Sequence, residues 1–249
     1  MLDLEFIVLV SIILLIASFV HGVAGFGFAI IPTPLIALFT DIQTAIVLTL
    51  IPTLVVNLVS FLSEGNTISA FKRFLPLALL VMLGSAIGTQ ILIFSDSNIF
   101  KLLLAFVILF YLFANKINLT IPTFKTHPKS TFVGFSLFAG LMGGLTNVIG
   151  PILMIYALEA KYTKAELIQA MNLSFLLGKI IQIVLFSING NFNTEQLTFS
   201  FASILLISFS LYLGIKVKRK IDTALYLKLI KIVLFIISII LIFQYFKEA

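Results

Sequence analysis

Lys179 is the residue of this chain best placed to do chemistry on a charged partner. It is the twelfth residue of an apolar run that begins at Ile168, which places it about 18 Å along a helix. A lysine at such a depth in hydrocarbon costs roughly 2.5–3.5 kcal/mol or more, so it needs a polar partner or an aqueous cavity. Asn172 shares its helical face, with Gln169 and Gln182 within a turn. This polar stripe predicts an anion pathway, and the alternative is a lysine satisfied by the carbonyls of a broken helix.

Two apolar segments each contain a glycine cluster followed by proline: residues 21–34 read HGVAGFGFAIIPTP and residues 140–151 read GLMGGLTNVIGP. Glycine lets the backbone turn sharply and approach a ligand, and the N–H groups of a half-helix attract an anion. In lipid, such breaks persist only inside protein or beside water. Paired breaks in two halves therefore predict a midplane binding site. The candidate substrate ligands are Gly22, Gly25, Gly27, Gly143, Gly144, Thr146, Asn147, Asn172 and Lys179. For Thr146 and Asn147, helix capping is an equally good interpretation.

Three further polar residues are candidates for a proton or polar relay: His21, Asn57 and Gln182. Histidine titrates near neutral pH and could exchange a proton with a weakly basic substrate. Equally, His21 could hydrogen-bond the backbone freed at the first break. Asn57 belongs to a helical series of polar residues around Pro52 that either faces the cavity or packs helices together.

The composition identifies an integral membrane protein. Of 249 residues, 61% are hydrophobic and 10% charged, with a mean hydropathy of +1.21, whereas soluble domains carry about 25% charged residues. Apolar runs of helical length and the lack of strict alternation predict an all-α fold. Cysteine is absent and there are 2 histidines, so we expect no metal site and no cofactor. The acidic residues lie near helix ends, which argues against an enzyme.

The apolar runs divide the chain into two similar halves within a single membrane transport domain, 1–249. Repeat 1 covers 1–117, a polar linker covers 118–129, and repeat 2 covers 130–249. The acidic start differs from the basic start of a signal peptide, so we expect the first helix to be retained. The expected spans, besides the broken segments, are 42–62, 74–94, 98–115, 167–188, 197–215 and 225–246.

Loop charge distinguishes two topologies. If both broken segments cross the membrane, giving eight plain spans, the Lys and Arg residues divide 6 against 9 between the two sides. If both are re-entrant hairpins, the division is 13 against 2 with Lys179 inside, which agrees with the excess of positive charge on cytoplasmic loops. This favours two inverted repeats, each a hairpin plus three transmembrane helices, about eight membrane segments in all. Both termini would then be non-cytoplasmic. The alternative is that the breaks are kinks in full spans.

These motifs resemble the TauE/SafE family of sulfite and organosulfonate exporters: Gly22, Gly25 and Gly27 with two prolines in the first half, and the 140–151 motif in the second. Phe26 and Phe28 occupy positions that are often glycine in the family. The resemblance implies a permease that exports a sulfur oxyanion across the bacterial inner membrane by alternating access. An anion channel and a non-transport membrane subunit are the alternatives. The expected partners are the anion and the lipid bilayer, a homo-oligomer is left open, and nucleic acid is excluded.

Overall fold

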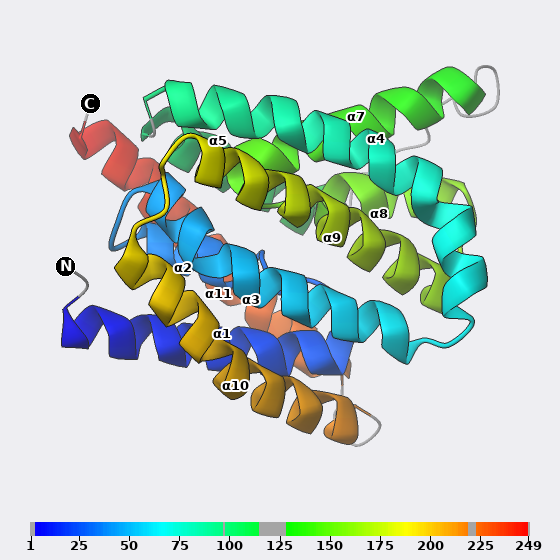
Figure 1. Ribbon diagram of the computed structural model, residues 1–249, viewed down its shortest axis with the longest axis horizontal. Helices are drawn as coiled ribbons and strands as arrows, with labels where there is room; N and C mark the ends of the chain where they lie inside the picture. The colour runs from blue at the N-terminus through cyan, green and yellow to red at the C-terminus, as the bar shows by residue number, and fades with distance from the viewer. Residues whose placement is uncertain (1–2, 97, 115–127, 219–222, 249) are drawn as a thin grey trace.

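The computed structural model describes residues 3–96, 98–114, 128–218 and 223–248. All the regular elements within these ranges are α-helices, as Figure 1 shows. The first half contains α1 (Leu4–Ala24), α2 (Pro32–Ala37), α3 (Ile42–Ser63), α4 (Thr67–Phe94) and α5 (Asn98–Ala114). The second contains α7 (Pro128–Thr146), α8 (Gly150–Glu159), α9 (Lys164–Ile188), α10 (Thr194–Val217) and α11 (Thr223–Glu248). The predicted all-α class is confirmed.

Side-chain caps fix where four of the long helices begin. The Asp3 carboxylate accepts from the backbone N–H of the third residue of α1, and Asp41 does the same at α3. Thr163 and Asn193 form capping boxes at the starts of α9 and α10. A capping side chain satisfies N–H groups that the helix itself leaves free. The apolar helices therefore begin at polar residues.

Within the described residues, five helices are long and apolar enough to cross a membrane: α1, α3, α4, α9 and α10. Their outer faces carry large apolar side chains, among them Ile16, Leu83 and Leu205, that are more than half exposed. Their inner faces bury most of the polar side chains that the described residues enclose. Apolar outside and polar inside is the pattern of a protein that uses lipid as its solvent. The protein is a polytopic helical membrane protein.

The two breaks are shorter than the sequence predicted. Helix α1 continues through Gly22 to Ala24 and ends at Gly25, whose φ of 88° is left-handed. Helix α7 continues through Gly143 and Gly144 to Thr146, and the expected gap at 143–151 contracts to 147–149. Between residues 28 and 39 only α2 is helical. The expectation that Gly22, Gly143 and Gly144 interrupt the helices was wrong, because these glycines are held in the helices by close neighbours.

Each broken segment returns the chain toward the end where it began. Helices α1 and α3 run in the same direction, since Val10 and Leu48 lie together near their starts and His21 contacts Ser60 near their ends. Ring contacts from Phe132 to Tyr156 (5.8 Å) and from Tyr156 to Tyr162 (6.1 Å) bring the starts of α7 and α9 together in the same way. Figure 1 shows the two termini at the same end of the molecule.

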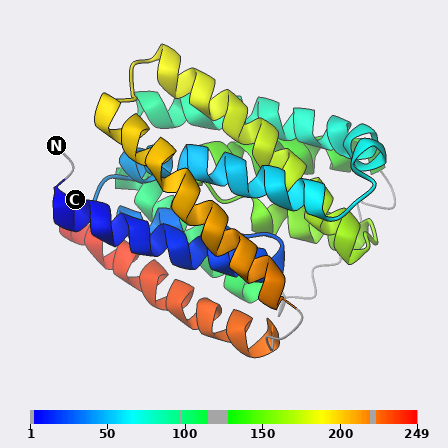
Figure 2. The ribbon, with the colours of Figure 1, turned by 60° about the horizontal axis from the view of Figure 1, so that its bottom comes forward.

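Two pairs of helices pack through glycine with no side chain between them. In α4 and α7 the contact involves Gly84, Gly88, Gly140 and Gly144, and in α1 and α10 it involves Gly22 and Gly214. A Cβ on Gly22 would lie 2.5 Å from the Leu211 carbonyl oxygen. Figure 2 shows α10 (orange) meeting α1 (dark blue) near the ends of both helices. Small residues let membrane helices approach closely enough for extensive van der Waals contact.

We predict that Gly140→Val destabilises the protein by about 3 kcal/mol, the upper range for overpacking a tight contact. A Cβ at this position would lie 2.0 Å from the Val81 carbonyl oxygen, which is backbone and cannot rotate away. Gly134→Ala in the same helix is the control, because nothing lies within 4 Å of its Cβ position. It should stabilise α7 by up to about 1 kcal/mol. Thermal unfolding in detergent measures both, and a Gly140→Val protein as stable as wild type would contradict the packing.

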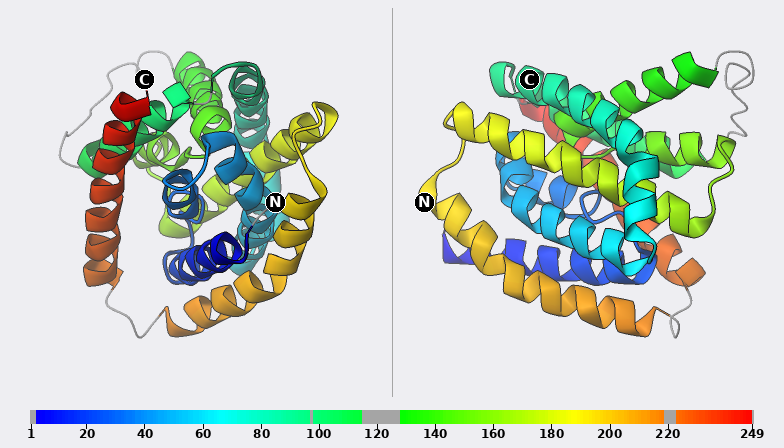
Figure 3. Two further views of the ribbon diagram at one scale, coloured as in Figure 1. Left: turned by 90° about the vertical axis from the view of Figure 1, so that its left-hand side faces the viewer. Right: turned by 45° about the vertical axis from the view of Figure 1, so that its right-hand side comes forward.

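Helix packing groups eight of the helices into two units that cut across the two halves. In the first, which we call the α1 unit (α1, α2, α3 and α10), Ser210 Oγ donates to the Leu15 carbonyl at 2.7 Å, joining α10 to α1. In the second, the α7 unit (α4, α7, α8 and α9), Ser85 Oγ donates to the Gly178 carbonyl at 3.3 Å, joining α4 to α9. Figure 3, right, shows the two groups on opposite sides. The α1 unit therefore includes α10 from the second half of the chain, and the α7 unit includes α4 from the first half.

Candidate functional site

Lys179 lies at the centre of a buried polar network. Its side chain is only 2% exposed, and its Nζ donates to the amide oxygens Asn147 Oδ1 and Gln182 Oε1. Across the described ranges, no acidic side chain is buried. The ammonium is therefore solvated by amide dipoles instead of being paired with a carboxylate. An anion that reached this point would meet an uncompensated positive charge.

Asn147 joins the second break to the first. It occupies the gap between α7 and α8 with a φ of 66°, a left-handed conformation that asparagine tolerates better than most residues. Its Nδ2 donates to Thr33 Oγ1 at 2.6 Å and to Thr49 Oγ1 at 3.0 Å. Thr33 belongs to α2 and Thr49 to α3. The two interrupted segments and the α9 lysine thus meet in a single network.

Gln182 and Thr146 form hydrogen bonds with the backbone at the second break. Gln182 Nε2 donates to the carbonyl of Gly144 at 3.3 Å, so this glutamine links Lys179 to the end of α7. Thr146 Oγ1 donates to the Met142 carbonyl at 2.7 Å and accepts from the backbone N–H of Val148 at 3.3 Å. Thr146 therefore satisfies the backbone where the helix stops, which is the capping role that the sequence left open.

His21 holds the first break at the end of α1. Its Nδ1 accepts a hydrogen bond from the backbone N–H of Phe28 at 3.1 Å. Because a neutral ring that accepts at Nδ1 carries its proton on Nε2, Nε2 is the donor to Ser60 Oγ at 2.8 Å. His21 thus secures the returning backbone against α3. This arrangement matches the structural interpretation of His21 and uses both ring nitrogens.

Asn172 connects α9 to the first break, much as Lys179 connects it to the second. Its Nδ2 donates to the carbonyl of Gly25 at 2.9 Å and to the carbonyl of Ile168 at 2.8 Å. Its Oδ1 is buried and has no hydrogen-bond partner in the described residues. The polar stripe predicted on α9 therefore reaches the first break through Asn172 and the second break through Lys179.

The structure separates the remaining candidates from this network. Gly22 packs against α10, and Gly143 lies under the side chain of Ile149. Gly25 and Gly27 form the turn after α1, both with positive φ. Asn57 donates to the Thr53 carbonyl one turn earlier in α3. Asn147, Lys179, Gln182 and Gly144 are the candidates that the fold brings together.

Thr33 is the network residue that sequence reasoning missed. It is the single polar residue between Phe28 and Phe39, and it stands between Pro32 and Pro34. A polar residue flanked by prolines inside an apolar segment is a usable signal, because proline fixes the local backbone and removes N–H donors. What the sequence could not supply is the partner, since Asn147 lies 114 residues away.

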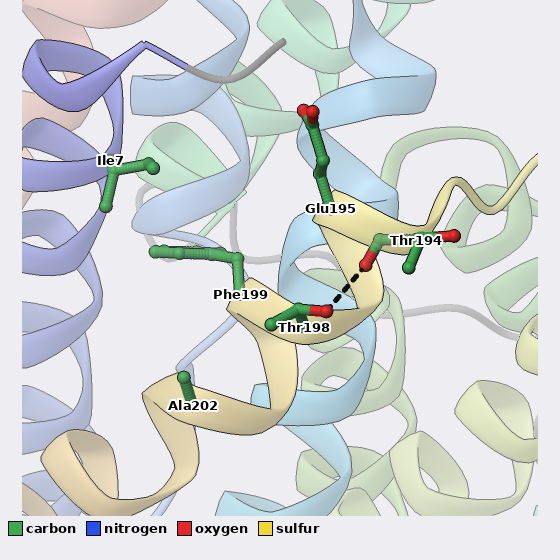
Figure 4. A pocket seen from close by; sticks show the side chains of 6 residues that line it. All are labelled: Ile7, Thr194, Glu195, Thr198, Phe199 and Ala202. Atoms are coloured by element: carbon green, nitrogen blue, oxygen red, sulfur yellow. Dashed lines mark hydrogen bonds between the residues drawn. The ribbon is translucent and has the colours of Figure 1, made fainter.

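A separate hollow opens between the starts of α1 and α10, as Figure 4 shows. Its volume is about 330 Å³, and it is lined by Ile7, Thr194, Glu195, Thr198, Phe199 and Ala202. All six residues lie in the first three turns of these two helices, and none of them belongs to the Lys179 network. The carboxylate of Glu195 on its wall makes it a poor receptor for an anion.

Apolar helices with a buried lysine where two interrupted segments meet define a membrane protein of the transporter class. The family model for the sulfite exporter TauE/SafE matches residues 10–241, and the chain belongs to this family. The family resemblance predicted from the glycine and proline motifs is confirmed, and with it a membrane transporter of sulfur anions at the level of the family. No curated protein and no solved structure matched the chain.

Proposed function

We propose that this protein exports a small sulfur oxyanion, sulfite or a small organosulfonate, across the bacterial inner membrane by alternating access. The observation that carries the proposal is the ammonium of Lys179, buried and held by two amide oxygens where the breaks meet. A substrate oxygen can take the place of either amide oxygen at Nζ. An anion makes a stronger, charge-assisted hydrogen bond there than a neutral amide does.

The charge of the site is consistent with outward movement of an anion. A lysine ammonium in the membrane without a carboxylate partner is costly, and a bound anion neutralises it. An inside-negative membrane potential drives an anion outward by about 2.3 kcal/mol per charge per 100 mV. Export therefore requires no coupling ion in principle.

In this mechanism the moving bodies are the α1 unit and the α7 unit. Around the site they are joined by side-chain amides: Asn147 Nδ2 donates to Thr33 and Thr49, and Asn172 Nδ2 donates to Gly25. Within each unit, by contrast, one pair of long helices packs through glycine, backbone against backbone: α1 with α10 in the α1 unit, and α4 with α7 in the α7 unit. A few amide hydrogen bonds break and reform at low cost, whereas close-packed helices move together. Movement of one unit against the other would open the network first to one side and then to the other.

The topology we propose is two inverted repeats, 1–117 and 130–249, in one transport domain; most of the linker, 118–129, lies outside the described residues. Two observations support it. If α1–α5 correspond to α7–α11, the glycine contact of α1 with α10 is equivalent to that of α7 with α4. The start of α4, which carries Lys72, the start of α9 at Lys164 and the end of α10, which Lys218 follows, lie at the end of the molecule opposite the termini. The positive end is then cytoplasmic, with both termini outside the cytoplasm.

We predict that single cysteines report this orientation, since the chain contains none of its own. Ser95→Cys lies in the exposed turn between α4 and α5, and Ala160→Cys lies in the exposed turn between α8 and α9. In intact spheroplasts, a membrane-impermeant maleimide should label the variant at position 95 and label the variant at position 160 only after lysis. The reverse order would contradict the proposed orientation.

Anion flux in proteoliposomes tests the proposed function. Sulfite, sulfate, thiosulfate and methanesulfonate are each offered to vesicles containing the purified protein. We expect saturable flux of at least one sulfur oxyanion, with competition by its close analogues. Flux that rises without saturation would favour a channel, and the absence of flux for all four anions would contradict the proposal.

A further inference from the structure

We propose that Thr89 on α4 is a further substrate ligand, whose hydroxyl donates a hydrogen bond to the anion bound at Lys179. This inference rests on the transport function proposed above. It adds a hydrogen-bond donor from α4, a helix of the first half, to the donors Lys179 and Gln182 on α9.

Thr89 lies beside the Lys179 network at the level of Gln182. Helices α4 and α9 run in the same direction (Figure 1), and their starts are joined by Gln169 Nε2, which donates to the Gly65 carbonyl at 2.6 Å. One turn before Thr89, Ser85 contacts Gly178, which is one turn before Gln182. The backbone nitrogen of Thr89 is also 2.7 Å from the place that a Cβ on Gly144 would take.

The Thr89 hydroxyl is buried and unused. The residue is 0% exposed, and its Oγ1 has no hydrogen-bond partner in the part of the chain that the structure describes. Threonine within a helix commonly donates to the carbonyl four residues earlier, as Thr49, Thr53 and Thr146 do in this protein. A buried hydroxyl that makes no hydrogen bond is unfavourable and rare. A ligand that accepts from this hydroxyl would remove that cost.

The chemistry of the neighbouring groups identifies the ligand as an oxyanion. Lys179 Nζ and the amide of Gln182 are hydrogen-bond donors in the network that reaches Gly144, the glycine next to Thr89, and a threonine hydroxyl adds a neutral donor. An oxyanion with several oxygens accepts from donors in different directions at the same time. A halide has a single centre that all the donors must share. We therefore infer that Thr89 contributes to the preference for oxyanions.

The test is Thr89→Val, which keeps the branched shape and removes the hydroxyl. Sulfite flux in proteoliposomes should show a KM raised by about 10-fold or more, the loss expected for a hydrogen bond to a charged group. The thermal midpoint should stay the same or rise, because the lost hydroxyl had no partner. Thr89→Ser should restore the KM to within about 3-fold of wild type.

Ser174→Ala is the matched control. Ser174 Oγ is likewise buried without a partner in the described residues, but it lies about 7.5 Å before Lys179 along α9 and on a different face of that helix. Its removal should leave the KM for sulfite unchanged. A wild-type KM in Thr89→Val, or an equal rise in KM in Ser174→Ala, would overturn the assignment while leaving the transport function standing. No sulfite flux in the wild type would overturn both.

Discussion

Lys179→Met is expected to reduce sulfite flux at least about 100-fold, because its ammonium is the positive charge that the buried network of Asn147, Lys179 and Gln182 offers to an anion. Methionine keeps an unbranched side chain that is one atom shorter than that of lysine, and it removes the charge. Two effects on stability oppose each other: a buried charge is lost, which is often favourable, and the oxygens of Asn147 and Gln182 lose their donor, which costs about 1–3 kcal/mol each. The thermal midpoint should therefore change little compared with the flux.

The comparison that isolates the charge of Lys179 uses a second lysine. Lys216→Met removes a lysine that is exposed near the end of α10 and should leave flux unchanged. Lys179→Arg keeps the charge but places a larger, planar group in a fully enclosed network, and it should recover only part of the activity. The sulfite flux of both variants is measured in the same proteoliposome assay. Full flux in Lys179→Met would show that the anion does not use this ammonium.

The sequence predicted the chemical elements of the site better than their arrangement. Lys179 stood out because a charge deep in an apolar run is expensive, and Asn147 because it follows a glycine cluster. Thr33 did not stand out, since its role depends on a partner from the other half. The role of Thr89 likewise depends on its contact with Gly144. Local composition identifies groups that need partners, but tertiary packing determines which partners they find.

The helix breaks show the same limit for the backbone. Gly22 and Gly144 were expected to end helices, and both lie within them. The reason is that α10 and α4 approach these glycines so closely that a side chain would not fit. The favourable packing outweighs the low intrinsic helix propensity of glycine, which is about 1 kcal/mol per residue. Through these contacts α4 of the first half packs on α7 of the second half, and α10 of the second half packs on α1 of the first half. The sequence alone did not predict this arrangement.

Cross-linking tests which parts of the protein move as rigid bodies: the α1 and α7 units, or the two halves of the sequence. The pair Ser85→Cys and Gly178→Cys joins the two halves within the α7 unit. A Cβ on Gly178 would lie 3.7 Å from the Ser85 Cβ, within the range for a disulfide. If the units move as bodies, oxidation of this pair should leave sulfite flux nearly unchanged.

The pair Gln43→Cys and Ile93→Cys makes the opposite connection, within the first half but between the units. Gln43 Nε2 donates to the Leu92 carbonyl at 2.8 Å, so α3 and α4 lie close enough here for a short bifunctional thiol reagent. This bridge should abolish flux, and cleavage of the bridge should restore it, because rocking of one unit against the other requires these helix ends to separate. If the two halves moved as bodies, the results would be exchanged: the 85–178 disulfide would stop transport and the 43–93 bridge would not.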